Sequence, residues 1–324
     1  MQSVLRFVFF YGAVIYSGLA QSVEPTVQFR FRTADPSSDA PIKVLRFVRS
    51  PQGLHALCRA GSSFVLISRD HSGSVRQVQL REDYPLSFDV DDAGRYISAY
   101  VDRSGKAEVQ IRSGGQITHR WLTPARFRPE TVLSAGPRIL LISRDGRWLG
   151  GDPEGLGDAS EVQTVAADGA AGLVTDSAGA YAVAADPVGG RVQWWTDGSV
   201  GPARLLSSPA LERARQAFSR ENEQFRAKGA RTRNRILAWV AVSPDGALAA
   251  LATGWKVHGR MPLDRCAPDG RFLGEVRLRP LLNPSGRPAA LTGMQFDGDK
   301  VWVGDETGLV SEFRLRTLAA GGRP

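Results

Sequence analysis

The sequence predicts an all-β fold made of six similar units, with one helical insertion. A pattern of a strand, an Asp/Gly turn and a second strand recurs along the chain. Four copies are clear, at residues 87–101, 173–185, 239–253 and 294–304. Two looser copies lie at residues 45–59 and 132–143. No long helical pattern separates these short strands. Such spacing is typical of an all-β array and excludes a parallel α/β sheet.

The turn glycines set the length of the repeat. They are Gly53, Gly94, Gly136, Gly179, Gly246 and Gly298. Successive members lie 41, 42, 43, 67 and 52 residues apart, so four units keep a nearly constant length and one carries an insertion. Glycine suits a tight hairpin turn because such turns need positive φ, which a Cβ atom penalises.

Each unit continues with a second, outer hairpin. Residues 107–111 and 116–122 flank a Ser-Gly-Gly turn, and residues 263–267 and 272–278 flank a Pro-Asp-Gly turn. A four-stranded unit cannot bury both faces by itself, so such units pack radially. The predicted fold is therefore a six-bladed β-propeller with one helical insertion between blades four and five.

One early segment offers a way to close the ring. The last repeat, residues 290–317, contains three clear strands, the third at residues 309–316. Residues 27–31 alternate between apolar and polar side chains, as a strand does, and no neighbouring segment of the sequence offers a strand to pair with them. We expect this strand to complete the last blade beside residues 309–316, because closure removes an exposed sheet edge.

Two turns resemble those of six-bladed bacterial propellers of the NHL-like group. They are residues 243–246 (SPDG) and residues 267–271 (APDGR). The Trp-Asp and Gly-His signatures of WD40 repeats are absent. The resemblance implies the architecture and names no activity, because fold does not determine function.

The N-terminus predicts export. Arg6 is followed by an apolar run at residues 7–16 and by small residues that end at Ala20. The run is shorter than the ~20 residues that span a bilayer. We therefore expect a signal peptide at residues 1–20, a single propeller domain at residues 21–324 and a periplasmic or secreted protein without a stable membrane span after cleavage.

The two cysteines are predicted to be unpaired. Export permits a disulfide. Cys58 and Cys266, however, fall in the predicted blades one and five, which are not neighbours in a six-membered ring. Cys58 also shares a strand face with Leu54 and Ala56, so we expect it to be a small buried apolar residue.

The chain carries no recognisable catalytic motif. A Gly-x-Ser-x-Gly elbow, a P-loop and a dinucleotide glycine fingerprint are all absent. The histidines have no spacing that suits a metal pair: His55, His71, His119 and His258. We therefore assign no catalytic residue, no metal ligand and no cofactor.

A lactonase-type hydrolase with a divalent cation in the central channel is the alternative. Such sites use carboxylates and asparagine amides, and the chain has three asparagines, two of them in or beside the insertion. Four aspartates are conceivable ligands, but each is predicted at a turn where Asp caps its own backbone. These aspartates are Asp91, Asp176, Asp245 and Asp297.

The insertion, residues 207–235, predicts a basic helix. Ser208 and Pro209 form a helix start and Gly229 a stop. One face of this helix is an apolar stripe that can dock on the propeller, formed by Leu211, Ala214, Phe218 and Phe225. Asn222 interrupts this stripe. Eight basic and three acidic side chains between residues 211 and 235 leave a charge of +5, out of +8 for the chain.

This charge favours an anionic partner, although a charge run is as often a solvated face. The candidate partner-binding residues are Arg213, Arg215, Arg220, Arg226, Lys228 and Arg231. The sequence thus predicts an exported, non-catalytic interaction or scaffold module that binds a protein or an anionic polymer in the cell envelope. Export argues against nucleic acid as the physiological partner.

Overall fold

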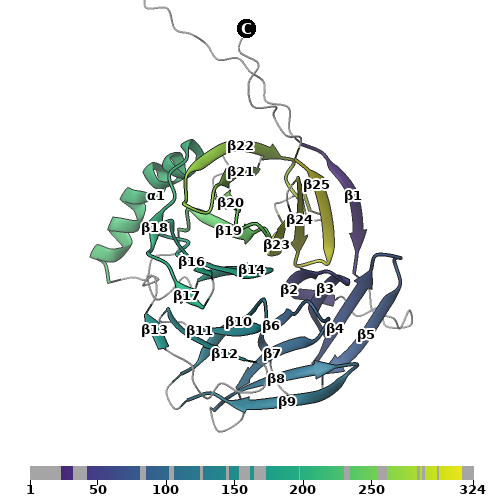
Figure 1. Cartoon of the computed structure of the whole chain (residues 1–324). Helices are drawn as coiled ribbons and strands as arrows, with labels where there is room; N and C mark the ends of the chain where they lie inside the picture. Colours follow the sequence, from purple (N-terminus) through teal and green to yellow (C-terminus); the bar gives the residue numbers. More distant parts are fainter. Residues whose placement is uncertain are drawn as a thin grey trace, which may run out of the picture.

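The described strands form six antiparallel sheets arranged as the blades of a propeller (Figure 1). The computed structural model describes residues 23–31, 42–80, 85–101, 106–124, 127–143, 146–152, 161–163, 173–196, 198–229, 234–253, 261–282, 285–286, 289–297 and 299–315. The predicted signal peptide lies outside these ranges. Positive φ at the turn glycines forms the hairpins, and the inner strands of each blade are largely buried on both faces, whereas the outer strand of blade two is half-buried on alternate residues.

The first three blades follow the chain order. Blade one contains β2 (Ile42–Ser50), β3 (Gly53–Ala60), β4 (Ser63–Asp70) and β5 (Val75–Leu80). Blade two contains β6 (Pro85–Val90), β7 (Tyr96–Val101), β8 (Ala107–Ser113) and β9 (Gln116–Leu122). Blade three contains β10 (Pro129–Ala135), β11 (Arg138–Ser143), β12 (Arg147–Gly151) and β13 (Glu161–Gln163).

The other three blades include the insertion and the closure of the ring. Blade four contains β14 (Val174–Ala178), β15 (Tyr181–Ala185), β16 (Arg191–Thr196), β17 (Ser199–Val200) and the short β18 (Arg204–Leu205). Blade five contains β19 (Leu237–Val242), β20 (Leu248–Ala252), β21 (Met261–Cys266) and β22 (Phe272–Leu278). Blade six contains β23 (Leu291–Asp297), β24 (Lys300–Asp305), β25 (Leu309–Arg314) and β1 (Pro25–Arg30).

The N-terminal strand closes the ring, which confirms the prediction. β1 pairs antiparallel with β25 in the register Gln28↔Ser311. Just before β1, Val23 forms a parallel bridge with Leu278 at the end of β22. Just after β1, Phe31 is buried in a core cluster with residues of blade one. The segment from Val23 to Phe31 therefore joins blades five, six and one.

Close packing between sheets fills the spaces around the ring. One core cluster combines residues of blades five and six, and another combines residues of blades two and three. At the junction of blades six and one, a Cβ atom on Gly293 would lie 2.5 Å from the carbonyl oxygen of Phe47. Glycine is thus required where these two sheets approach most closely.

The predicted turns and the helix are present. The five predicted turn glycines that lie within the described ranges have positive φ, whereas Gly298 lies outside them. Helix α1 (Pro209–Ala227) follows β18 and precedes β19, between blades four and five. Among the described residues no helix has both the length and the apolar character that crossing a membrane requires.

Candidate functional site

Helix α1 begins at a cap that is fastened to blade five. The hydroxyl oxygen of Ser208 accepts a hydrogen bond from the backbone N–H of Leu211 at 3.1 Å. The same hydroxyl donates to Oδ2 of Asp264 in β21. Both side chains are buried, and burial raises the pKa of Asp264 to about 7. Ser208 therefore caps the N-terminus of the helix and also attaches that end of the helix to the propeller.

Three of the four residues of the predicted apolar stripe of α1 pack on blades four and five, whereas Phe225 is half-buried and lies outside the core cluster there. Leu211 and Ala214 are buried in a core cluster formed by these two blades, and Phe218 packs against its edge. Asn222, which interrupts the stripe, is also buried and donates from Nδ2 to the carbonyl oxygen of Asn234 at 3.3 Å. This asparagine is thus a polar anchor of the helix.

The basic side chains of α1 divide into anchored and outward-facing groups. Arg213 forms an ion pair with Glu275 of β22 at 3.3 Å. Arg215 is partly buried and donates to Glu212 and to the carbonyl oxygen of Leu206. These two guanidinium groups therefore already have partners within the chain.

The far end of the helix is more open. Arg220, Arg226 and Lys228 are exposed. Within the described part of the chain, neither Arg220 nor Lys228 forms an ion pair. Arg231 lies outside the described residues. Figure 1 shows α1 along the outer side of the ring.

A buried polar cluster at the centre of the ring was not predicted. Asp89 in β6, an innermost strand, accepts hydrogen bonds from the backbone N–H of Ser134 at 2.7 Å and from the hydroxyl of Ser177 at 2.8 Å. Its other oxygen accepts from the N–H of Val90. One carboxylate thereby connects blades two, three and four.

Asp176 makes the matching connections to blades five and six. It accepts from the N–H of Val242 at 2.8 Å and from Nε2 of Gln295 at 2.6 Å. The prediction that Asp176 caps a turn is wrong, because β14 continues to Ala178 and directs Asp176 into the buried centre. In the sequence, this buried cluster could have been recognised from a charged residue inside an apolar strand, as in Phe88-Asp89-Val90.

Arg46 of β2 completes this central cluster from blade one. Burial raises the pKa of Asp89, and the positive charge of Arg46 partly offsets that rise. Burial also raises the pKa of Asp176 well above its ordinary value. All four carboxyl oxygens already accept hydrogen bonds, and Arg46 adds a positive charge. A divalent cation takes about six or more oxygen ligands, whereas this cluster offers two carboxyl groups beside a guanidinium, so its residues do not fit such an ion.

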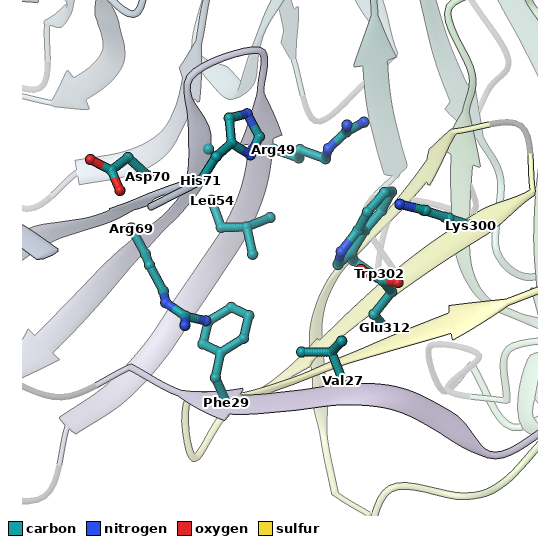
Figure 2. A pocket seen from close by; sticks show the side chains of 11 residues that line it. Val27, Phe29, Arg49, Leu54, Arg69, Asp70, His71, Lys300, Trp302 and Glu312 are labelled. Atoms are coloured by element: carbon teal, nitrogen blue, oxygen red, sulfur yellow. The ribbon is translucent and has the colours of Figure 1, made fainter. Parts of the chain in front are cut away.

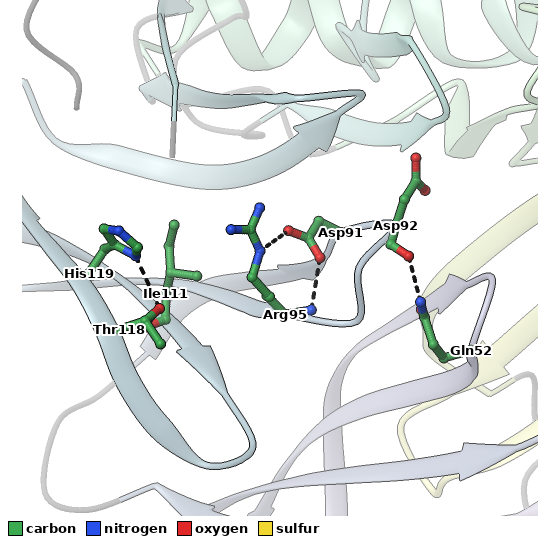
Figure 3. A network of polar contacts seen from close by, with 7 residues as sticks. All are labelled: Gln52, Asp91, Asp92, Arg95, Ile111, Thr118 and His119. Atoms are coloured by element: carbon green, nitrogen blue, oxygen red, sulfur yellow. Dashed lines mark hydrogen bonds and ion pairs between the residues drawn. The ribbon is translucent and has the colours of Figure 1, made fainter. Parts of the chain in front are cut away.

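Two of the other predicted aspartates do cap their own turns. Asp91 accepts from the N–H of Arg95 at 2.8 Å and from its Nε at 2.6 Å (Figure 3). Asp245 accepts from the N–H of Ala247. Asp297 instead forms an ion pair with Arg49 at 2.7 Å. None of the three converges on the central cluster.

The described histidines have structural partners. His55 is buried between the hydroxyls of Ser50 and Ser68, and burial lowers its pKa to about 4. His119 bonds to the hydroxyl of Thr118 at 3.1 Å (Figure 3). In the ranges that the structure describes, no three His, Cys, Asp or Glu residues gather as metal ligands would.

No known family model matches the chain, and no curated protein is a detectable relative of it. Solved structures show a similar fold. Virginiamycin B lyase from Staphylococcus aureus, in a catalytically inactive form with quinupristin, has a TM-score of 0.53 and 13% identity over 88% of this chain and 83% of its own.

Raptor from Chaetomium thermophilum has a TM-score of 0.50 and 11% identity, covering 90% of this chain and 24% of that one. BamB from Moraxella catarrhalis has a TM-score of 0.46 and 14% identity, covering 91% of this chain and 100% of its own. At such low identity the likeness to the lyase and to Raptor concerns the fold alone. The chain is therefore a six-bladed β-propeller with one helix between blades four and five.

Proposed function

We propose that this propeller is a non-catalytic interaction or scaffold module that binds a protein or an anionic polymer through helix α1. The observation that carries the proposal is a basic helix held firmly on the ring. Its cap, its apolar stripe and Asn222 are all anchored, whereas Arg220, Arg226 and Lys228 are exposed. A pre-ordered helix loses less entropy when a partner binds.

We further propose that the partner lies in the cell envelope and that the chain is an exported member of the NHL-like group. The N-terminal apolar run followed by small residues supports export. The two Pro-Asp-Gly turns support the group assignment. The central cluster favours a non-catalytic module over the alternative, a lactonase-type hydrolase, because the carboxyl oxygens of Asp89 and Asp176 already accept hydrogen bonds within the protein.

Replacing three cations of α1 tests this proposal. We expect the variant Arg220→Gln, Arg226→Gln, Lys228→Gln to melt within ~2 °C of the parent, because exposed charges add little stability. Its elution from a heparin column should shift to lower salt, and its capture of envelope proteins at low salt should weaken. Residual binding should depend less on salt, since fewer charges take part.

A matched variant controls for net charge. Arg76, Arg120 and Arg138 are exposed on blades one to three, outside the two blades on which α1 packs. Their replacement by Gln removes the same charge and should leave elution and capture closer to those of the parent. Equal shifts for both triple variants would show that heparin senses only net charge, and α1 would then have no special role.

A further inference from the structure

We propose that a pocket between the first and last blades binds a small carboxylate that carries an apolar or aromatic group. The pocket lies where β3 and β4 of blade one meet β24, β25 and β1 of blade six (Figure 2). Its volume is about 270 Å³. That is just below the ~300–1,000 Å³ of pockets for drug-sized ligands, so the ligand is small. Blades five and six separate the pocket from helix α1 (Figure 1).

Apolar side chains form one part of the lining. Phe29 of β1 and Leu54 of β3 are half-buried, and Val27 of β1 is 46% exposed. Trp302 of β24 is 7% exposed and lies on the other wall. Figure 2 shows these groups around a shared space. An apolar ligand body would displace water from them.

Cations placed beside the aromatic rings form the second part. The guanidinium carbon of Arg69 lies 4.3 Å from the ring centroid of Phe29. The ammonium of Lys300 lies 5.8 Å from the ring centroid of Trp302. Within the described ranges neither cation forms an ion pair. Arg49 also stacks on Trp302, but its charge is paired with Asp297.

The carboxylates that line the pocket have other partners. Asp70 accepts from the hydroxyl of Ser72 at 2.6 Å and from the N–H of Ser74 at 2.9 Å, within its own turn. Glu312 accepts from Thr26 at 3.2 Å and from Arg314 at 3.4 Å. The charge of Glu312 is offset by Arg314. Asp70 keeps its negative charge, but Figure 2 shows its carboxylate at the margin of the pocket, away from the space between Phe29 and Trp302. With Arg49 paired to Asp297, Arg69 and Lys300 are the cations that remain for a ligand.

The combination selects the chemistry of the ligand. Two positive side chains on the walls of the pocket favour an anion, because each attracts a carboxylate, which accepts charge-assisted hydrogen bonds. A bare inorganic anion would leave the apolar lining hydrated. An acid with one aromatic or branched apolar group matches both parts of the pocket. A free small acid and the C-terminal residue of a peptide share this chemistry.

Titration calorimetry with N-acetyl-L-phenylalanine tests the proposal. We expect this acid to bind at least tenfold more tightly than its uncharged amide, N-acetyl-L-phenylalaninamide. Arg69→Gln and Lys300→Gln should each weaken binding of the acid about tenfold, as expected for loss of one charge-assisted contact. Binding of the amide should change little. Equal binding of acid and amide, or unchanged binding by both variants, would overturn the proposal.

Two further variants separate binding from folding. Val27→Trp keeps every charge and fills the pocket from an exposed position, so it should abolish binding of the acid while the protein stays folded. Arg120→Gln, on blade two, removes a charge elsewhere and should bind as the parent does. Undiminished binding by Val27→Trp would place the acid at another site and overturn the proposal.

Short peptides that end in free phenylalanine distinguish the two sources of the carboxylate. Tighter binding of such a peptide than of the free acid supports capture of a chain end, and the reverse order supports a small acid. Absence of binding by both would overturn the proposal. The triple variant of α1 should bind N-acetyl-L-phenylalanine normally, so this site and the proposed docking helix can fail independently.

Discussion

Asp264 links the protonation of one carboxyl group to the attachment of α1. Its side chain is fully buried against the capping hydroxyl of Ser208, and its Oδ1 has no hydrogen-bond partner among the described residues. Burial raises its pKa from 3.8 to about 7. The folded protein therefore holds this proton at pH values where the unfolded chain has released it. The stability contributed by Asp264 is complete below pH ~4 and is lost as pH rises through about 7.

Asp264→Asn should remove this pH dependence. The amide oxygen can still accept from Ser208, and the side chain stays neutral at every pH. We expect the variant to be more stable than the parent at pH 8, by up to about 4 kcal/mol, and to lose that advantage at pH 4. Urea unfolding at pH 4, 6 and 8 measures the difference. A difference that is constant across pH would contradict the assignment.

At the scale of elements, the segment from Val23 to Phe31 holds three blades together. β1 supplies the outer strand of blade six, Val23 bridges to blade five, and Phe31 packs near Phe47 of blade one with ring centroids 6.4 Å apart. An open ring would expose the edge of β25 and the face of blade one. Closure therefore depends on one short segment whose partners in blades five and six lie near the other end of the chain.

Phe31→Ala should weaken this closure. The side chain is 3% exposed, and truncation of a buried phenylalanine costs about 3–5 kcal/mol. We expect a lower urea midpoint and faster proteolysis at the N-terminal segment. Val27→Ala in the neighbouring strand removes an exposed side chain and should change stability by less than ~0.5 kcal/mol. Equal effects of the two variants would show that Phe31 does not secure the ring.

At the scale of the whole molecule, the central cluster ties the six innermost strands to one another. Arg46 comes from β2, while Asp89 and Asp176 receive hydrogen bonds from β10, β14, β19 and β23. Buried charges are costly unless they are hydrogen-bonded and balanced. Every carboxyl oxygen of Asp89 and Asp176 accepts a hydrogen bond, and Arg46 offsets part of their charge, so the cluster serves to hold the ring together.

The ring geometry also predicts the state of the two thiols. Cys58 lies in blade one and Cys266 in blade five, and both are free and buried. Burial raises the pKa of each thiol to about 12, so very little thiolate is present at pH 8. We expect almost no reaction with a thiol reagent in the native protein and two reactive thiols in denaturant. No reactive thiol in denaturant would reveal a disulfide.

Local signals determined most of the architecture. The spacing of the turn glycines predicted six blades, the Ser208-Pro209 start and Gly229 bounded the helix, and the unpartnered early strand predicted closure. The turns and the helix ends depend on residues close in sequence, and the closing strand was recognised from its own alternation of polar and apolar residues. Such preferences act before any long-range contact forms, and the sequence therefore displays them directly.

The tertiary structure alone decided which side chains meet. Asp176 and Gln295 are 119 residues apart in the chain, yet they share a hydrogen bond at the centre. Phe29 and Arg69 meet only because β1 joins the last blade beside the first. The central cluster and the pocket between these blades depend on the order, tilt and spacing of whole sheets. Local sequence patterns do not predict that geometry, because it results from packing all six blades into one closed ring.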